Sequence, residues 1–387
     1  MSIIATDKTY IAGTYGRFPV ELVRGEGSVL YSADNKRYID MGTGIAVNTF
    51  GISDPVWTDA VTAQLTRLQH TSNLYYTEPC ALLAKELCER SGMKKVFFGN
   101  SGAEANECAI KVARKWGEEN KGEDYYTVIT LRNSFHGRTI TTLSATGQDH
   151  YHRHFGPMTP GFVYAETENL DEVRSLAKNH KCCAIMFECV QGEGGVIPLS
   201  AEFVHGLKAI AEEYDLLLIV DEVQTGNGRC GQFYCYMNYG IKPDVVSTAK
   251  GLGGGLPIGA VLLGEKVENT LRPGDHGSTF GGNPVCAAGA LNVIRRLDDT
   301  TLRGVRERSD YIKEKLIGKS GIKSISGMGL MIGIETVKPA REIVAACLER
   351  GVLCLTAKDK VRLLPALNIP MDILDEALNV IIDVCAE

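Results

Sequence analysis

The stretch from Val245 to Gly259, VVSTAKGLGGGLPIG, joins a short β-forming run to a lysine and a glycine-rich turn. Val245 to Thr248 favour a buried strand, and four of the five residues after Lys250 are glycine. Burial would lower the pKa of this lysine, and its neutral amine would then be a nucleophile toward carbonyl groups, as a Schiff base requires. A surface lysine before a flexible loop is the alternative interpretation.

Composition limits the classes of protein to which the chain can belong. Its 387 residues, 44% of them hydrophobic, can bury a large core, and its net charge of −6 without a basic patch argues against nucleic acid as a partner. No apolar run reaches the about 18 residues of a membrane span, and the N-terminus does not resemble a signal peptide. The 12 cysteines lie on apolar segments without a CxxC pair, so we expect buried thiols in a reducing cytoplasm.

Predicted strands and helices alternate from about residue 50 to 280. This alternation indicates an α/β domain around a mostly parallel sheet. Glu188, Asp221 and Lys250 each lie at or just beyond the C-terminal end of a predicted strand. Ligands bind at that edge in open parallel sheets, so we expect these three side chains at one site.

The pattern changes on both sides of this alternating region. Residues 1–50 are expected to form an arm and a hairpin, with its turn at Asp34-Asn35, that join a small domain. Residues 51–282 would form the large domain. Residues 283–387 would supply an interdomain helix and a smaller α+β domain.

A candidate anion site follows the predicted strand KKVFFG. Ser101, Gly102 and Ala103 open a predicted helix, where a hydroxyl and free backbone N–H groups suit a phosphate. Ser101 with Glu104 also matches a capping box, which is a structural role and stays open as the alternative.

Several other side chains suit a flat, charged heterocycle. A buried Asp221 needs a cation, and the ring nitrogen of a bound pyridine would serve and make the ring an electron sink. Gln224 could approach a phenolic oxygen, and Phe135 could stack on the ring. Arg138 and Arg362 could grip carboxylates. Salt bridging, capping, core packing and surface exposure are the structural alternatives for these residues.

Two further patterns give weaker hypotheses. Residues 226–231, GNGRCG, match GxGxxG. No Ala-rich helix follows them, and no second strand ending in an acidic residue lies about 20 residues further on, which argues against a dinucleotide-binding oxidoreductase. His150, His152 and His154 could share a metal-binding face. No constellation of cysteines or carboxylates supports such a site, so we expect a loop and no metal site.

Six motifs together are highly specific, and they resemble those of the class III (ω-) aminotransferases of PLP fold type I along nearly the whole chain. In order, these are SGAEANECAIKVAR (101–114), SFHGRT (134–139), QGEGG (191–195), DEVQTGNGRCG (221–231), STAKGLGGGLPIGA (247–260) and HGSTFGGNP (276–284). The resemblance implies a large domain with a mostly parallel seven-stranded sheet plus a smaller α+β domain. GISDP (51–55) replaces the usual GHxHP, and Cys189 replaces a common proline, which puts only local loop geometry in doubt.

The resemblance also implies roles for individual residues. Lys250 would hold pyridoxal 5′-phosphate as a Schiff base and then move the substrate proton, while Asp221 would pair with the ring nitrogen. The other cofactor-binding positions would be Ser101, Gly102, Ala103, Phe135, Glu188, Val223, Gln224 and, from the partner subunit, Thr279. The substrate-binding positions would be Tyr15, Asn73, Arg138, Glu193, Ser278 (also from the partner) and Arg362. Arg362 resembles the arginine that takes the α-carboxylate of glutamate, and Glu193 resembles the glutamate that masks it.

Within this family, the arm YGRFPV (15–20) and the loop PGDHGSTFGGNP (273–284) most resemble members that act on N2-acetylornithine. The resemblance implies a cytoplasmic homodimer that transfers the δ-amino group of N2-acetyl-L-ornithine to 2-oxoglutarate. The products would be N-acetyl-L-glutamate 5-semialdehyde and L-glutamate, in a ping-pong reaction of arginine biosynthesis. Ornithine, succinylornithine or 4-aminobutyrate as the amine donor, and a non-catalytic binding protein of the same fold, are the alternatives.

Overall fold

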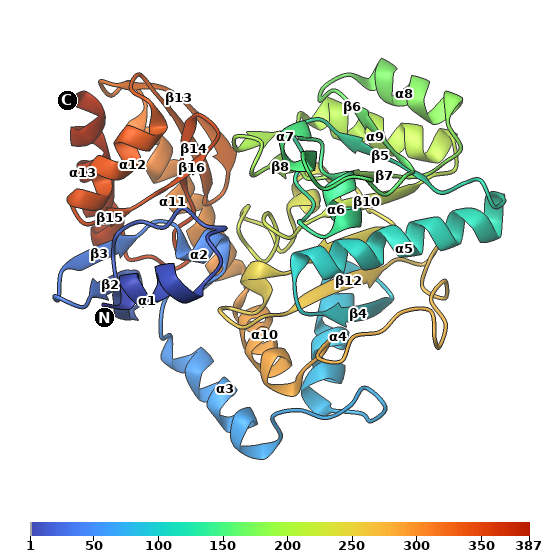
Figure 1. The fold of residues 1–387 in the computed structure, drawn as a ribbon, viewed down its shortest axis with the longest axis horizontal. Helices are drawn as coiled ribbons and strands as arrows, with labels where there is room; N and C mark the ends of the chain where they lie inside the picture. The colour runs from blue at the N-terminus through green and yellow to red at the C-terminus, as the bar shows by residue number, and fades with distance from the viewer. Residues whose placement is uncertain (1) are drawn as a thin grey trace.

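A seven-stranded sheet forms the centre of the larger part of the molecule (Figure 1). The computed structural model describes residues 2–387. Across the sheet the strands are β4 (Lys95–Gly99), β12 (Gly259–Leu263), β11 (Val245–Thr248), β10 (Leu217–Asp221), β7 (Cys182–Phe187), β5 (Thr127–Leu131) and β6 (Phe162–Ala165). Neighbours are parallel except where β12 pairs with β11 and β4. The predicted mostly parallel, seven-stranded sheet is confirmed.

Helices cover both faces of this sheet because alternate residues of its strands point to opposite sides. In β10, Leu218 and Val220 belong to one buried cluster and Leu217 and Ile219 to the other. Helix α5 packs on the second cluster, and α8 and α9 pack on the first. The helices of this part are α3 (Pro55–Arg67), α4 (Glu78–Ser91), α5 (Gly102–Lys121), α6 (Ile140–Ala145), α7 (Asp149–His152), α8 (Leu170–Asn179), α9 (Ala201–Glu213) and α10 (Pro284–Arg296), with the short 3₁₀ helix η1 (Cys235–Tyr239).

The antiparallel strand β12 makes the chain turn back at the carboxyl edge of the sheet. Val245 pairs with Leu263 and Thr248 with Ala260, so β11 and β12 form a hairpin. Lys250 lies in the connection between them, at the start of the short 3₁₀ helix η2 (Lys250–Leu252). The lysine is therefore held beyond the carboxyl ends of the parallel strands, between two strands of the same sheet.

The smaller part of the molecule combines both ends of the chain. Strand β15 pairs in parallel with β3, which places the N-terminal strands beside the C-terminal ones (Figure 1). One sheet contains β1 (Leu22–Glu26), β2 (Val29–Ser32), β3 (Arg37–Asp40) and β15 (Val352–Leu353); another contains β13 (Ile322–Met328), β14 (Met331–Thr336), β17 (Lys360–Leu363) and β16 (Leu355–Ala357). The other elements of this part are α1 (Ile3–Tyr10), α2 (Thr43–Ala46), α11 (Asp299–Leu316), α12 (Ala340–Glu349) and α13 (Met371–Ala386). The two-stranded ladder of β8 (Val190–Gln191) and β9 (Ile197–Pro198) follows β7 in the larger part (Figure 1).

The hairpin predicted before residue 40 is confirmed, since β2 and β3 pair antiparallel around Asn35, which has a φ of +63°. Helix α1 was not predicted, because its sequence carries no apolar stripe and none of its residues is buried. The domain boundaries at residues 50 and 282 stay predictions.

The cysteines are packing residues, as their apolar surroundings predicted. All 12 are free thiols, and only Cys80, Cys88 and Cys286 are half-buried, while the others are buried. Burial raises the pKa of Cys108 to about 12, so this thiol is unreactive at neutral pH. Within residues 2–387, no helix is long and apolar enough to cross a bilayer.

Candidate active site

Three polar side chains lie together at the carboxyl edge of the sheet. Asp221 is the last residue of β10, Glu188 directly follows β7, and Lys250 comes two residues after β11. Since β7, β10 and β11 are neighbours in the sheet, their carboxyl ends bring together three side chains that are up to 62 positions apart in the sequence.

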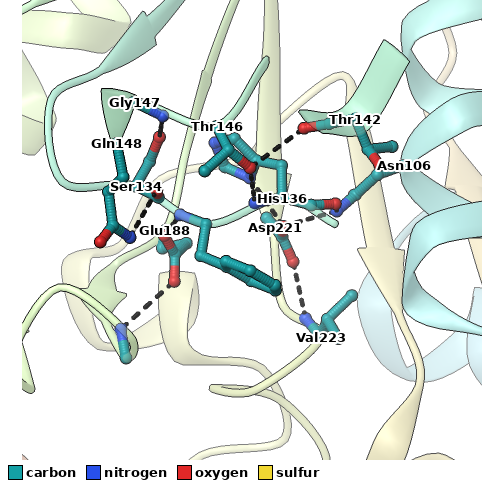
Figure 2. A network of polar contacts seen from close by, with 12 residues as sticks. Asn106, Ser134, His136, Thr142, Thr146, Gly147, Gln148, Glu188, Asp221 and Val223 are labelled. Atoms are coloured by element: carbon teal, nitrogen blue, oxygen red, sulfur yellow. Dashed lines mark hydrogen bonds and ion pairs between the residues drawn. The ribbon is translucent and has the colours of Figure 1, made fainter. Parts of the chain in front are cut away.

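Asp221 is a buried carboxylate held by three donors (Figure 2). Its Oδ2 accepts hydrogen bonds from Asn106 Nδ2 at 2.7 Å and from His136 Nδ1 at 2.8 Å, and its Oδ1 accepts from the Val223 amide at 3.0 Å. Asn106 also donates to the His136 carbonyl at 2.7 Å. Because buried polar groups need hydrogen-bond partners, this network holds the carboxylate in one orientation.

Lys250 has the properties of a nucleophilic amine. Burial lowers its pKa, and the nearby Arg362 charge lowers it further, against the opposing effect of Glu193. Its backbone φ is +46°, a left-handed conformation that costs roughly 1–2 kcal/mol in a residue other than glycine. Asn227 Nδ2 donates to the carbonyl of Ala249 at 3.1 Å and so supports this strained connection.

Arg362 from β17 reaches the same site from the smaller part of the molecule. Its Nη1 lies 2.5 Å from Glu193 Oε1 and donates to Gln224 Oε1 at 3.0 Å, and Gln224 Nε2 donates to Glu193 at 3.3 Å. Burial alone would raise the pKa of Glu193, but the guanidinium holds it below its ordinary value. The buried arginine thus carries one internal carboxylate, which an incoming carboxylate could replace.

Glu188 lies near Asp221 (Figure 2) and bonds the backbone of Phe135. Glu188 Oε1 accepts from the Phe135 amide at 2.8 Å, and Oε2 accepts from the Gly192 amide at 3.2 Å. Burial raises the pKa of Glu188 to about 7. Arg138 is exposed, and its guanidinium lies 4.2 Å from the ring centre of Tyr151, which packs edge-on against Phe135.

The N-terminus of α5 contains the predicted capping box. Ser101 Oγ accepts from the Glu104 amide at 3.2 Å, and Glu104 Oε2 accepts from the Asn100 amide at 2.7 Å. The first intrahelical bond runs from Ala105 to the Ser101 carbonyl, so the Gly102 and Ala103 amides precede the ladder and remain available to an anion. A Cβ at Gly102 would lie 2.6 Å from Val223 Cγ1, so only glycine fits there.

The other candidate substrate residues lie at the surface. Asn73 Nδ2 donates to the carbonyls of Ser278 and Gly281, at 2.9 Å each, and Ser278 Oγ accepts from Asn100 Nδ2 at 3.0 Å. Tyr15 and Thr279 are exposed, and no hydrogen bond among residues 2–387 joins either of them to Lys250 or Asp221. One chain therefore does not bring the complete predicted set together.

The two weaker hypotheses find no support. In the GNGRCG segment a Cβ at Gly228 would lie 2.8 Å from Leu367, and buried Arg229 donates to the carbonyls of Leu330 and Pro365. The segment is thus packed against residues from the C-terminal part of the chain, and the next element is the 3₁₀ helix η1 and not an α-helix. His152 hydrogen-bonds the Leu143 and Thr146 carbonyls, and residues 2–387 contain no cluster able to hold a metal ion.

Asn106 is a contact residue of Asp221 that the sequence analysis missed. A signal was present, since Asn106 is a polar residue on the otherwise apolar buried face of α5, next to Ala105 and Ala109. Buried polar side chains have partners in nearly all proteins, and this one holds the carboxylate at the sheet edge.

Comparisons with known proteins agree with this geometry. A family model described as aminotransferase class-III matches residues 10–385. The acetylornithine aminotransferase of Haemophilus ducreyi is 48% identical over 383 residues, which cover 98% of each chain. The Toxoplasma gondii ornithine aminotransferase, solved with partially occupied PLP at its active site, has a TM-score of 0.93 and 30% identity, covering 99% of this chain and 93% of that one. The N-acetylornithine aminotransferase of Stenotrophomonas maltophilia has a TM-score of 0.85 and 32% identity, covering 99% and 98%. With a buried lysine and a buried aspartate at one edge of its sheet, a family model that matches residues 10–385 and a relative 48% identical over 98% of its length, the chain belongs to the class III aminotransferases.

Proposed function

We propose that this chain transfers the δ-amino group of N2-acetyl-L-ornithine to 2-oxoglutarate, with pyridoxal 5′-phosphate as its cofactor. The proposal rests on one observation: Lys250 and Asp221, whose carboxylate accepts three hydrogen bonds, lie at the same edge of the sheet. The chain that carries them is 48% identical to an acetylornithine aminotransferase. Buried free thiols suit a reducing compartment, and we place the reaction in the cytoplasm, in arginine biosynthesis.

The residues at the edge fit this cofactor. The fixed Asp221 carboxylate offers the negative charge that a protonated ring nitrogen needs, and the Gly102 and Ala103 amides offer donors to a phosphate. Gln224 stands beside Val223, within reach of Glu193 and Arg362. When bound, the cofactor supplies an electron-withdrawing ring that stabilises negative charge at the substrate carbon.

Lys250 is the residue that moves protons. Because burial lowers its pKa, the amine loses its proton more readily than that of an exposed lysine and can accept a proton from the substrate carbon, then return it one position along. General acid–base transfer of this kind contributes about 10²–10⁴-fold to the rate. Asp221, held in one orientation by Asn106 and His136, would pair with the protonated ring nitrogen.

Arg362 distinguishes the two substrates. With 2-oxoglutarate or glutamate, the guanidinium would release Glu193 and take the incoming α-carboxylate, whose planar shape matches it. With the amine donor, the Glu193 pair would stay closed. Ornithine, succinylornithine and 4-aminobutyrate as rival donors differ in a few contacts of about 1–3 kcal/mol each, so the donor is an experimental question.

We further propose that two copies of the chain complete each other's sites. The apolar patch formed by Leu74, Tyr75, Tyr76 and Phe280 is exposed, with Tyr76 fully so, and Asn73 ties its two loops together. Exposed apolar patches of this kind mark protein interfaces. Thr279 is next to Phe280, so a partner that covers the patch would bring its own Thr279 toward a neighbouring site.

The test is the visible absorbance spectrum of the purified protein, recorded while N2-acetylornithine, ornithine and 4-aminobutyrate are added in turn. We expect the cofactor band to bleach with N2-acetylornithine and to return with 2-oxoglutarate. The Lys250→Ala variant should show neither the band of the lysine-bound cofactor nor turnover. Lys85→Ala, a change at a lysine on the exposed surface of α4, is the matched control and should behave as wild type.

Either of two results would contradict the proposal. A band that bleaches only with another amine would keep the cofactor and change the donor. The absence of any band after addition of pyridoxal 5′-phosphate would remove the cofactor and with it the role of Lys250.

A further inference from the structure

The turn of α2 has an unusual backbone. Four consecutive residues have positive φ angles: Thr43 at +47°, Gly44 at +66°, Ile45 at +66° and Ala46 at +62°. Residues with a side chain enter this left-handed region singly, and β-branched residues avoid it. A run of this kind persists only where surrounding contacts determine it.

One set of these contacts ties the turn to the strand that carries Arg362. Thr43 Oγ1 donates to the Leu364 carbonyl at 2.6 Å, and the Leu364 amide donates to the Met41 carbonyl at 2.7 Å. Leu364 follows Arg362 by two residues. Asp40 Oδ1 accepts from the Thr43 amide at 2.8 Å, so the hydroxyl of Thr43 is aimed from a fixed backbone.

A second set ties the turn to the lysine connection. Thr49 Oγ1 donates to the Gly251 carbonyl at 2.7 Å, and Thr49 is buried. A Cβ at Gly251 would lie 2.9 Å from Thr49 Oγ1 and 3.2 Å from the Ala46 carbonyl, so the turn abuts the peptide after Lys250. The Leu367 amide also donates to the Thr49 carbonyl at 2.9 Å.

We propose that Thr49 and Thr43 are positioning residues, and that the left-handed turn sets Lys250 and Arg362 relative to each other. This inference rests on the proposed function and extends it to residues that touch neither substrate nor cofactor. Thr49 holds the carbonyl of Gly251, the residue after Lys250, and so directs the amine of Lys250. Thr43 holds the end of β17 and so directs the Arg362 guanidinium.

The two threonines therefore affect different kinetic constants. Thr49→Val keeps the shape but leaves the Gly251 carbonyl without its donor, and we expect kcat to fall about tenfold in both half-reactions with the KM for 2-oxoglutarate within about twofold. Thr43→Ala removes the donor to Leu364, and we expect the KM for 2-oxoglutarate to rise about tenfold while the half-reaction with the amine donor stays unchanged.

A spectroscopic measurement separates positioning from stability. The holoenzyme of each variant is titrated with pH, without substrate, and the midpoint of its visible absorbance change is recorded. We expect Thr49→Val to shift this midpoint and Thr43→Ala to leave it in place. Thr49→Ser and Thr43→Ser retain the hydroxyls and should restore the wild-type constants. If Thr49→Val does not fold by circular dichroism, Thr49→Ala removes the same donor.

The outcomes are distinct. Variants that lower only the melting temperature, with kcat, KM and the midpoint unchanged, would overturn the proposal, as would Ser variants as impaired as the Val and Ala ones. If the wild-type protein shows the cofactor band but rejects N2-acetylornithine, the proposed function has failed instead. The substrate-free titration still decides the role of Thr49 in that case.

Discussion

Glu222, the neighbour of Asp221, is completely buried and belongs to a different network. Its Oε2 accepts from Thr225 Oγ1 at 2.6 Å and its Oε1 from the Tyr236 amide at 2.8 Å. Burial raises the pKa of Glu222 from 4.5 to about 7. The folded protein therefore holds a proton at this residue that the unfolded chain has released.

This difference makes stability depend on pH. Between about pH 4.5 and 7 the folded state binds more protons than the unfolded state, so the free energy of unfolding falls as pH rises, by on the order of 3 kcal/mol for Glu222. Glu222→Gln keeps both hydrogen-bonding positions without the charge. We expect its denaturant midpoint to vary less with pH than that of wild type, both saturated with cofactor.

Glu89→Gln, at a side chain 61% exposed on α4, is the control for this measurement and should keep the wild-type slope. Equal slopes in Glu222→Gln and wild type would contradict the protonated state of Glu222 at neutral pH.

At the scale of residues, the sequence could predict those that the sheet places directly. Lys250 and Asp221 follow strand runs, so their shared edge could be expected without coordinates. Asn106 could not be paired with Asp221, because 115 positions separate them and only the packing of α5 on the sheet brings them to 2.7 Å. The contact of Thr49 with Gly251 depends likewise on tertiary structure.

Helices α5 and α9 both begin with a serine N-cap, but different residues lie beside the two N-termini. Ser101 caps α5 by accepting from the Glu104 amide, and Ser200 caps α9 by accepting from the Phe203 amide at 3.0 Å. The α5 terminus abuts Val223, whose amide bonds Asp221, whereas the Ser200 amide at the α9 terminus bonds Glu168. The pair therefore separates the cost of a lost cap from the loss of an anion site.

We predict that Ser101→Ala and Ser200→Ala each lower the free energy of unfolding of the protein by about 1 kcal/mol, through loss of the cap. Ser101→Ala should in addition weaken the binding of pyridoxal 5′-phosphate, whereas Ser200→Ala should leave its dissociation constant unchanged. Fluorescence titration of the apoprotein with the cofactor measures the difference. Equal dissociation constants in the two variants would show that Ser101 only caps the helix.

The sequence predicted regular strands and helices, but it did not predict the irregular turn at residues 43–46. Strands such as β10 are continuous apolar runs, and the apolar face of α5 has helical spacing. The left-handed turn at residues 43–46 has no sequence pattern of its own. It is held locally by Asp40, which accepts from the Thr43 amide, and by the distant carbonyl of Leu364, which accepts from the Thr43 hydroxyl.

For the whole molecule, we expect each active site to combine residues from two copies of the chain. Thr279 and Tyr15 are exposed in the single chain, although the family resemblance assigns both to the active site. A dimer related by a twofold axis would expose the same patch on each copy to the other. Shared sites can be tested by combining two inactive variants.

We predict that a hybrid of one Lys250→Ala chain and one Thr279→Asp chain, co-expressed with two different affinity tags and purified through both, regains about half of the wild-type activity per dimer. One of its sites would carry both defects, and the other would carry neither. Each parent homodimer should be inactive or nearly so. A hybrid no more active than its parents, or a monomeric protein by sedimentation, would refute the exchange of Thr279.

The hairpin of β11 and β12 has a consequence for how such chains can diverge in length. Thr248 and Ala260 are paired neighbours in the sheet, so both ends of the segment between them are fixed in position. An inserted residue there would displace the lysine, whereas one in the exposed loop near Gly122 would meet only solvent. Descendants of this sequence can therefore lengthen at the periphery of the sheet but not across the eleven positions that carry the amine.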